Sequence, residues 1–274
     1  MKKLSFLAAS SALFFVACGG SSATDPDDVS SSNSSANETD FSAEACYSVE
    51  AYESLPACND KKEGQTGYVT GTLTDSRDGQ KYKTTKIGEQ VWMAENLNYA
   101  YLQPTDELDS SSFCYDNDPA MCKKYGRLYL WSAAMDSAGV LKNDGKGKGC
   151  GYGAECGVEG PIQGICPKGW HLPSGDEFDK LLVNVGASWK EQSVNLIANS
   201  WVDGKDEYGF SALPAGYYGS YGKRFYDLGY DAYFWSSTEY DSYGAYYLYL
   251  YDGRTGVNGS GQDNGRSVRC LQDN

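Results

Sequence analysis

Residues 166–174 have the sequence Cys-Pro-Lys-Gly-Trp-His-Leu-Pro-Ser, and they lead directly into an amphipathic run. Ser174 and Glu177 have the spacing of a capping box, in which each side chain accepts a hydrogen bond from the other residue's backbone. The apolar residues that follow recur on one helical face as far as Gly186; they are Phe178, Leu181, Leu182 and Val185. The pattern predicts a helix that Ser174 caps, with Trp170 packed in the core.

A second capped helix is expected just downstream, because Ser188 and Glu191 repeat the same spacing. Its core-facing residues should be Trp189, Val194, Ile197 and Ala198. Upstream, three stretches alternate as antiparallel strands do, with an Asp-Gly turn at 78–79 between the first two. These stretches are residues 68–74, 81–87 and 90–97.

The centre of the chain passes from an extended aromatic run into alanine-rich residues that could form a short helix, over residues 125–135. The glycine-dense stretch 139–160 follows. A phosphate-binding loop is an alternative there, but no Gly-Lys-Ser or Gly-Lys-Thr follows, and no strand and helix flank it. A calcium loop is another alternative, but the available oxygen ligands lack EF-hand spacing; they are Asn143, Asp144, Asp203, Asp206 and Glu207. We expect a surface loop pinned by a disulfide.

The final third contains four strand-like stretches, namely residues 210–218, 233–239, 245–251 and 267–271. Asp252-Gly253 is typical of a turn between two hairpin strands, and Asn264-Gly265 is a further turn signal. Strands, then two helices, then strands predict an α+β fold.

Nine cysteines are present, none in a Cys-x-x-Cys pair, and His171 is the only histidine, so no zinc site is expected. Assigning Cys18 to a lipid leaves eight, which favours disulfides in an exported protein. Three local pairs would close short loops and leave one long-range pair: Cys46–Cys58, Cys114–Cys122, Cys150–Cys156 and Cys166–Cys270. Eight cysteines allow on the order of 100 pairings, so this assignment rests on proximity alone.

Residues 1–17 have the features of an export signal, because Lys2 and Lys3 precede an apolar run too short to span a bilayer. Small residues then lead to Cys18, as in the lipobox of bacterial lipoproteins. Cys18 is the expected lipidation site and membrane anchor; the alternative is an ordinary signal peptide with a chance cysteine. Gly19 is not the aspartate that typically retains lipoproteins at the inner membrane, so the outer membrane is favoured.

Three segments follow the signal. Residues 18–40 are the lipidated cysteine and a polar tether, and residues 41–63 form a small lead-in closed by Cys46 and Cys58. The main domain spans residues 64–274, which is enough for one sizeable core.

Charge limits the partners of this chain. Removal of residues 1–17 leaves 21 Lys and Arg against 37 Asp and Glu, a net charge of −16. Such a surface repels polyanions and has no basic stripe, so nucleic-acid binding is not expected. Contact with lipid through a polybasic face is disfavoured for the same reason.

Six ordered motifs carry a resemblance to a known family. They are Trp-Met-Ala-Glu-Asn-Leu at 92–97, Tyr-Gly-Arg-Leu-Tyr at 125–129, Cys-Pro-Lys-Gly-Trp-His-Leu-Pro-Ser at 166–174, Leu-Pro-Ala-Gly at 213–216, Phe-Trp-Ser-Ser at 234–237 and Ser-Val-Arg-Cys at 267–270. With these motifs, the main domain resembles the Fibrobacter succinogenes major paralogous domain, whose members are exported or lipidated bacterial proteins.

That family in turn resembles the C-type-lectin-like fold of lectins, diversity-generating variable proteins and formylglycine-generating enzymes. The resemblance implies that strands near both ends of the domain pair beside two helices. Calcium-dependent sugar binding is not expected, because neither Glu-Pro-Asn nor Gln-Pro-Asp occurs and Phe-Trp-Ser-Ser lacks the Asn-Asp pair after Trp. No cofactor and no metal site are predicted.

No catalytic residues are predicted either. His171 lies between Trp170 and Leu172 just before a helix cap, which favours a packed, hydrogen-bonded side chain over a catalytic one. Redox chemistry would need reactive cysteines, whereas Cys166 and Cys270 belong to the matched structural motifs. A carboxylate pair for glycoside hydrolysis stays open, since the sequence marks no pair as close.

Tyrosine is concentrated in the last third of the chain and is interleaved with Gly and Ser, which is the composition of adaptable binding surfaces. The candidate ligand-binding residues are Tyr217, Tyr218, Tyr221, Tyr226, Tyr230, Tyr240 and Tyr243. Along residues 245–251, Tyr247, Tyr249 and Tyr251 alternate with Tyr246, Leu248 and Leu250, so one face should be core and the other could bind a ligand. The alternative is that the tyrosines merely cover a sheet.

Together these features predict a lipid-anchored cell-envelope protein with a non-catalytic domain that binds an extracellular glycan or a surface protein. The alternative is an enzyme that acts on polysaccharide or protein at the cell surface.

Overall fold

The computed structural model describes residues 70–251 and 253–274. The predicted export signal, Cys18, the tether and the Cys46–Cys58 pair lie outside the described residues, as does Asp252. Among the described residues, no helix is both long and apolar enough to cross a membrane.

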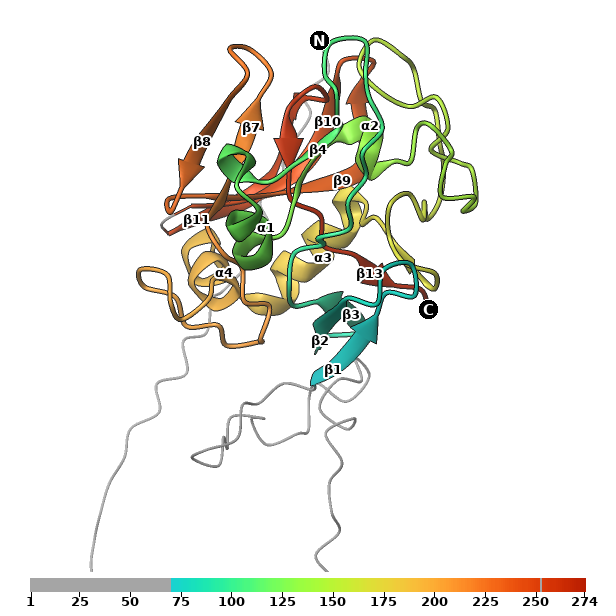
Figure 1. The fold of residues 1–274 in the computed structure, drawn as a ribbon. Coiled ribbons are helices and arrows are strands. Elements are labelled where there is room, and N and C mark those ends of the chain that lie inside the picture. Colours follow the sequence, from blue (N-terminus) through green and yellow to red (C-terminus); the bar gives the residue numbers. More distant parts are fainter. Residues whose placement is uncertain (1–69, 252) are drawn as a thin grey trace, which may run out of the picture. The chain divides into compact units, whose positions relative to one another are not determined.

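Three sheets, in which all named strand pairs are antiparallel, build the domain (Figure 1). The first contains, in spatial order, β1 (Thr70–Thr74), β2 (Lys81–Ile87), β3 (Gln90–Met93), β13 (Leu271–Gln272) and β6 (Trp170–His171). The second contains β4 (Ser112–Phe113), β5 (Leu128–Leu130), β12 (Gly265–Arg266), β7 (Ala215–Gly219) and β8 (Arg224–Leu228). The third contains β11 (Arg254–Gly261), β10 (Gly244–Tyr251) and β9 (Ala232–Asp241). With its helices, this architecture is α+β, as predicted.

The helices include the two predicted in mid-chain. They are α1 (Pro119–Tyr125), α2 (Trp131–Ala134), α3 (Gly175–Val185) and α4 (Trp189–Leu196), and a short 3₁₀ helix spans Tyr115–Asn117. The capping box at the start of α3 is confirmed: Glu177 N donates to Ser174 Oγ at 3.3 Å, and Ser174 N donates to Glu177 Oε2 at 2.8 Å.

The first core cluster lies between α3 and the β9–β11 sheet. Phe178 and Leu181 of α3 and Leu248 and Leu250 of β10 are all fully buried there. Trp92 joins them from β3 and stacks on Phe178, with ring centroids 5.5 Å apart. Each such side chain contributes about 1.5–3 kcal/mol on burial, so this layer fixes one face of the β9–β11 sheet.

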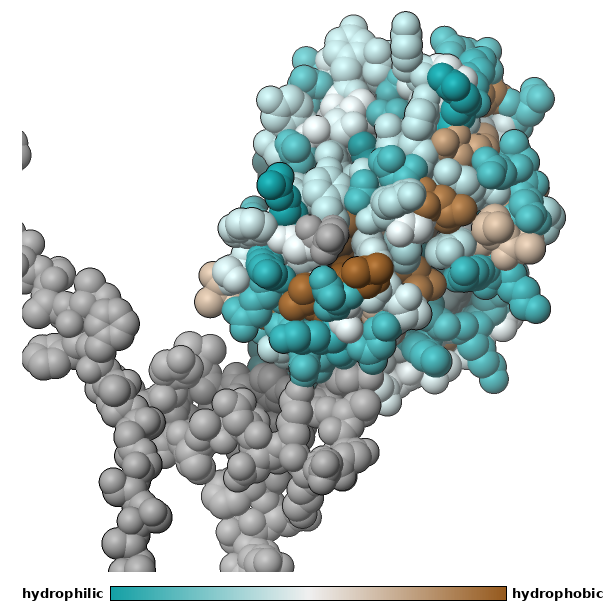
Figure 2. Space-filling view, turned by 90° about the vertical axis from the view of Figure 1, so that its left-hand side faces the viewer, coloured by the Kyte–Doolittle hydropathy of each residue, from teal (hydrophilic) through white to brown (hydrophobic). Residues whose placement is uncertain are grey.

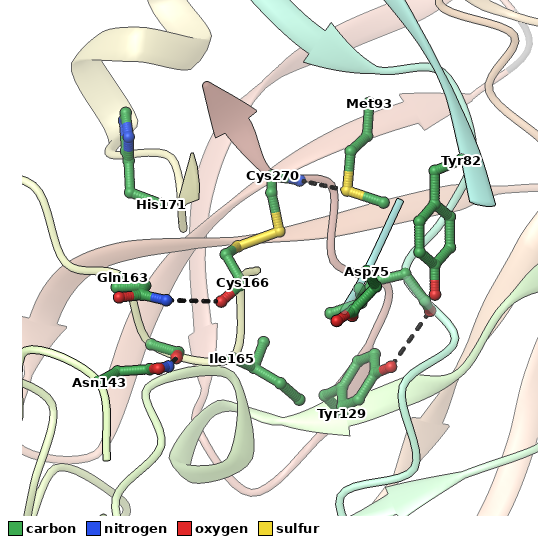
Figure 3. Close-up of a disulfide and its surroundings, with 12 residues drawn as sticks. Asp75, Tyr82, Met93, Tyr129, Asn143, Gln163, Ile165, Cys166, His171 and Cys270 are labelled. Carbon is green, nitrogen blue, oxygen red and sulfur yellow. Dashed lines mark hydrogen bonds between the residues drawn. A yellow bond between two sulfur atoms is a disulfide. The ribbon is translucent and has the colours of Figure 1, made fainter. Parts of the chain in front are cut away.

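The stretch 166–174 lies in a second core cluster. Cys166 and Cys270 form a disulfide, as predicted (Figure 3). Both cysteines are fully buried, and Trp170 is buried in the same cluster, also as predicted. Leu271, next to Cys270, pairs with Trp92 of β3 and His171 of β6. The end of the domain is therefore linked to its middle by the disulfide and lies between β3 and β6 in the first sheet. The structure also contains the predicted Cys114–Cys122 and Cys150–Cys156 bonds.

Trp189 corrects the prediction for the second helix. It was expected to face inward, yet 56% of its surface is exposed. It occupies the first position of α4, at the edge of the packed layer, where the Arg254 guanidinium lies 5.9 Å from its ring. Val194 is half-buried, whereas Ile197 and Ala198 are buried as expected.

Several element boundaries also differ from the prediction. Helix α1 was not foreseen, although Asp118 caps it by accepting a hydrogen bond from Ala120 N at 2.9 Å and Pro119 opens it. The first strand after Phe210 begins only at Ala215, since Ser211 has a φ of 52° that extended backbone does not adopt. A strand was expected over residues 267–271, but β13 contains only Leu271 and Gln272.

Candidate ligand-binding cleft

A cleft of about 490 Å³ opens between the β7–β8 hairpin and the β9–β11 sheet. Figure 1 shows this hairpin at the upper left, beside that sheet. Tyrosines from both sheets and from the turn between β7 and β8 form much of the lining; they are Tyr217, Tyr221, Tyr226, Tyr233, Tyr247 and Tyr251. The polar residues of the lining include Asp227, Ser260, Asn264 and Arg266.

The tyrosine rings support one another. Tyr217 and Tyr226 are opposite each other in the β7–β8 ladder, and their rings stack with centroids 5.2 Å apart. The edge of Tyr233 meets Tyr217 at 5.4 Å, and Tyr233 also contacts Tyr247 and Tyr251. Rings held on several sides lose little freedom when a ligand binds, so this wall is preorganised.

Gly219 makes room for the Tyr226 ring. A Cβ atom at position 219 would come within 2.7 Å of that ring, closer than packed atoms approach. The glycine therefore lets the Tyr226 ring lie against β7, where it lines the cleft.

Arg266 lies on β12 among four aromatic rings. Its guanidinium carbon is 3.9 Å from the ring centroid of Tyr247, 4.8 Å from that of Trp235 and 5.0 Å from that of Tyr233, and Tyr217 follows at 5.5 Å. Only 4% of the residue is exposed, yet it lines the cleft. Burial lowers the pKa of this guanidinium, and the surrounding tyrosines act in the opposite direction. Arginine still keeps its charge at neutral pH.

Two carboxylates meet at one tyrosine hydroxyl beside the cleft. The Tyr233 hydroxyl is 2.9 Å from Asp227 Oδ2 and 3.0 Å from Asp231 Oδ2. Burial raises the pKa of Asp231; the hydrogen bond from Tyr233 lowers it and the charge of Asp227 raises it further. Burial and both carboxylates raise the pKa of Tyr233, so its hydroxyl stays protonated and donates.

Three of the seven candidate tyrosines come together in the cleft. Tyr217 and Tyr226 are half-buried in its wall, whereas Tyr221 is 97% exposed at its rim. Tyr218 is buried and stacks on Phe113 at 4.5 Å, on the other face of β7.

The other three candidates do not line this cleft. Tyr230, Tyr240 and Tyr243 are exposed. The Tyr243 ring meets Tyr152 edge-on at 5.1 Å and the Tyr240 ring meets Tyr246 at 5.3 Å, so these tyrosines form two ring pairs outside the cleft.

The cleft residues that were not predicted as site residues include Tyr233 and the polar residues Asp227, Ser260, Asn264 and Arg266. The one sequence signal that could have pointed to Arg266 is its place between the Asn264-Gly265 turn and the Ser-Val-Arg-Cys motif. The two faces of β10 are now assigned: Leu248 and Leu250 face the helices, while Tyr247 and Tyr251 line the cleft.

His171 occupies a separate, closed arrangement. Its Nδ1 lies 2.7 Å from Asp273 Oδ1 and its Nε2 lies 3.1 Å from Glu177 Oε1. Burial lowers the pKa of His171, but the hydrogen bonds to the two carboxylates outweigh it and raise the pKa above its ordinary value. Figure 3 shows its ring directed away from the Cys166–Cys270 sulfurs. Both ring nitrogens are thus engaged by carboxylates, which leaves neither free to activate a nucleophile.

Two of the oxygen-bearing residues weighed for a calcium loop accept hydrogen bonds from backbone amides. Asp144 accepts hydrogen bonds from the backbone amides of Lys146 and Gln163. Asp206 accepts one from the backbone amide of Ser211 at 2.7 Å. Within the described part of the chain, no group of three or more His, Cys, Asp and Glu side chains is placed to hold a metal ion.

On the face drawn in Figure 2, hydrophobic side chains gather in small groups within a largely hydrophilic surface. The chain thus contains a disulfide-stapled α+β domain whose aromatic cleft surrounds a buried arginine.

Comparison with known proteins identifies the family of this domain. Residues 85–272 match the model of the Fibrobacter succinogenes major domain, and the chain belongs to that family. No curated protein and no solved structure matches the chain.

Proposed function

We propose that this domain is a non-catalytic module that binds an extracellular glycan in the aromatic cleft. The observation that carries the proposal is the stacked pair of Tyr217 and Tyr226, with the exposed Tyr221 beside it. Sugar rings present C–H faces that pack on aromatic rings and hydroxyls that need hydrogen-bond partners. Tyrosine offers both a large flat contact and a hydroxyl.

A glycan fits the cleft better than a surface protein does. Its volume of about 490 Å³ lies in the range of small-molecule sites, which is roughly 300–1,000 Å³. A stable protein partner would cover about 800 Å² of the domain, chiefly on flatter surface. The exposed tyrosines outside the cleft, Tyr152, Tyr240 and Tyr243, are where a protein partner would be sought instead.

The cellular setting forms part of the same proposal. A lipid on Cys18 would hold the chain at the cell envelope, on the outer membrane, with the domain outside the cytoplasm. The pairing of β3 with β13 beside α3 and α4 supports a C-type-lectin-like arrangement. Binding should not require calcium, because the sequence lacks the calcium-ligating tripeptides of the sugar-binding lectins.

A glycan array probed with the detergent-purified full chain, with and without calcium, tests the proposal. We expect calcium-independent binding that the substitution Tyr221→Ala weakens by about tenfold or more, since an aromatic ring that stacks on a nucleobase contributes about 1–3 kcal/mol and a sugar ring presents a similar flat face. Tyr230→Ala is the matched control, because Tyr230 is also exposed but does not line the cleft. Equal weakening by both variants, or no binding on the array, would contradict the proposal.

A glycoside hydrolase is the second candidate, because Asp227 and Asp231 meet at the Tyr233 hydroxyl and Asp231 has a raised pKa. The substitution Asp227→Asn tests it, since asparagine tolerates the φ of 61° at this position. A hydrolase predicts release of reducing sugar that this variant abolishes. A binding module predicts no release from any glycan that the array identifies.

A further inference from the structure

Arg266 is a buried cation without a partner of opposite charge. Among residues 70–251 and 253–274, no carboxylate forms an ion pair with it, and its side chain makes no hydrogen bond. Its Nε is fully buried and unpaired, while the residue lines the cleft that the tyrosines enclose. The two Nη groups also make no hydrogen bond but are not fully buried, so they are the unused donors that a ligand in the cleft can reach.

Arg269, a second buried arginine, has the hydrogen bonds expected of a purely structural side chain. Arg269 is also fully buried, but its Nε donates to Asn96 Oδ1 at 2.8 Å and one Nη donates to Ser211 O at 2.9 Å. Its remaining Nη donates to the carbonyl of Phe210. Arg269 thus satisfies its donors within the protein, whereas Arg266 keeps its donors free.

We propose that Arg266 binds a carboxylate on the glycan, and that the cleft selects sugars that carry a uronate group. This inference rests on the proposed function. A guanidinium and a carboxylate match in a planar, two-bond geometry, and charge-assisted hydrogen bonds of this kind are roughly twice as strong as neutral ones. The ring faces around Arg266 stabilise its charge without occupying its donors.

Negative charge in the cleft and on the chain as a whole limits the ligand to a single carboxylate. Asp227 lines the same cleft, and the chain carries a net charge of −14. A second negative charge near the first would meet repulsion, whereas sugar hydroxyls can donate to Asp227 and accept from polar groups of Ser260 and Asn264. The structure favours a mostly neutral glycan with one uronate over a polyuronate.

Two small sugars give the sharpest test, because methyl glucuronide and methyl glucoside differ only by a carboxylate in place of a hydroxymethyl group. NMR titration of the full chain with each measures even weak affinities. We expect the glucuronide to bind at least about tenfold more tightly, which corresponds to about 1.4 kcal/mol. Arg266→Met should remove this preference and leave glucoside binding in place, while Arg266→Lys should keep part of it.

The outcomes distinguish failure of the carboxylate inference from failure of the proposed glycan binding. Equal affinity for both sugars, or a preference that survives in Arg266→Met, overturns the carboxylate inference and leaves the proposed function standing. Absence of binding to both sugars together with an empty glycan array overturns the proposed function itself. A tighter complex with polygalacturonate than with a singly charged oligosaccharide of equal length contradicts the limit to one carboxylate.

Discussion

Replacing Arg266 with methionine should make the domain more stable. The wild-type side chain holds an unpaired charge at 4% exposure, and taking an ion out of water costs several kcal/mol in real proteins. Four rings within 5.5 Å offset this cost, at about 0.5–2 kcal/mol each. The methionine variant lacks both the contacts between the guanidinium and the rings and the cost of burying a charge. It gains about 1.5–3 kcal/mol from its own burial and further contacts between its sulfur and the rings.

The balance predicts a gain of about 1–3 kcal/mol in the free energy of unfolding. For a domain of this size, that gain raises the Tm by roughly 2–12 °C. Urea unfolding of the full chain at neutral pH, with its disulfides intact, measures the first quantity, and thermal unfolding measures the second. A loss of stability of more than about 1 kcal/mol would refute the reasoning, because it would mean that Arg266 is a structural group whose burial is already compensated.

Three other predictions concern the structural parts of the domain. Replacing Cys166 and Cys270 by alanine should lower the free energy of unfolding by about 5 kcal/mol, and replacing Cys150 and Cys156 should lower it by about 2 kcal/mol. The difference arises because the first bond closes a loop of 104 residues and the second a loop of 6. Equal losses in urea unfolding would contradict this dependence on loop length. Ser174→Ala should cost about 1 kcal/mol through the lost cap of α3, whereas Ser200→Ala, at an exposed position outside the named helices and strands, should leave urea unfolding unchanged. His171 should titrate by NMR above its ordinary pKa of about 6.5 and fall toward it in Asp273→Asn. Since the pKa is higher in the folded state, the stability contributed by His171 is complete below about pH 6.5 and is lost as the pH rises through the folded value; stability that rises over this range would contradict the assignment.

The local patterns around residues 166–174 were sufficient to predict much of the fold. A capping box and one apolar face determine α3, and short loop spacing identified the Cys114–Cys122 and Cys150–Cys156 pairs. Helix α1 was missed because Asp118 and Pro119 form a short start signal without an amphipathic run behind it. Trp189 was placed wrongly because helical periodicity does not show where the edge of the sheet lies.

The candidate site was harder to predict, because its residues come from different strands. Composition singled out Tyr217, Tyr221 and Tyr226, but it grouped them with Tyr240 and Tyr243, which lie apart from the cleft. Strand β8, which follows the turn after Tyr221, was not predicted, so the cross-strand stacking of Tyr217 and Tyr226 could not be foreseen. The role of Arg266 depends on the absence of a partner around it, and only tertiary structure reveals that.

The most direct test of the central claim maps where a glycan touches the domain. The full chain, labelled at its tyrosines, is titrated with the tightest glycan from the array while the tyrosine NMR signals are recorded. If the cleft is the binding site, the signals of Tyr217, Tyr221 and Tyr226 shift together and saturate at one affinity. Shifts confined to Tyr152, Tyr240 and Tyr243, with the cleft tyrosines unchanged, would contradict it.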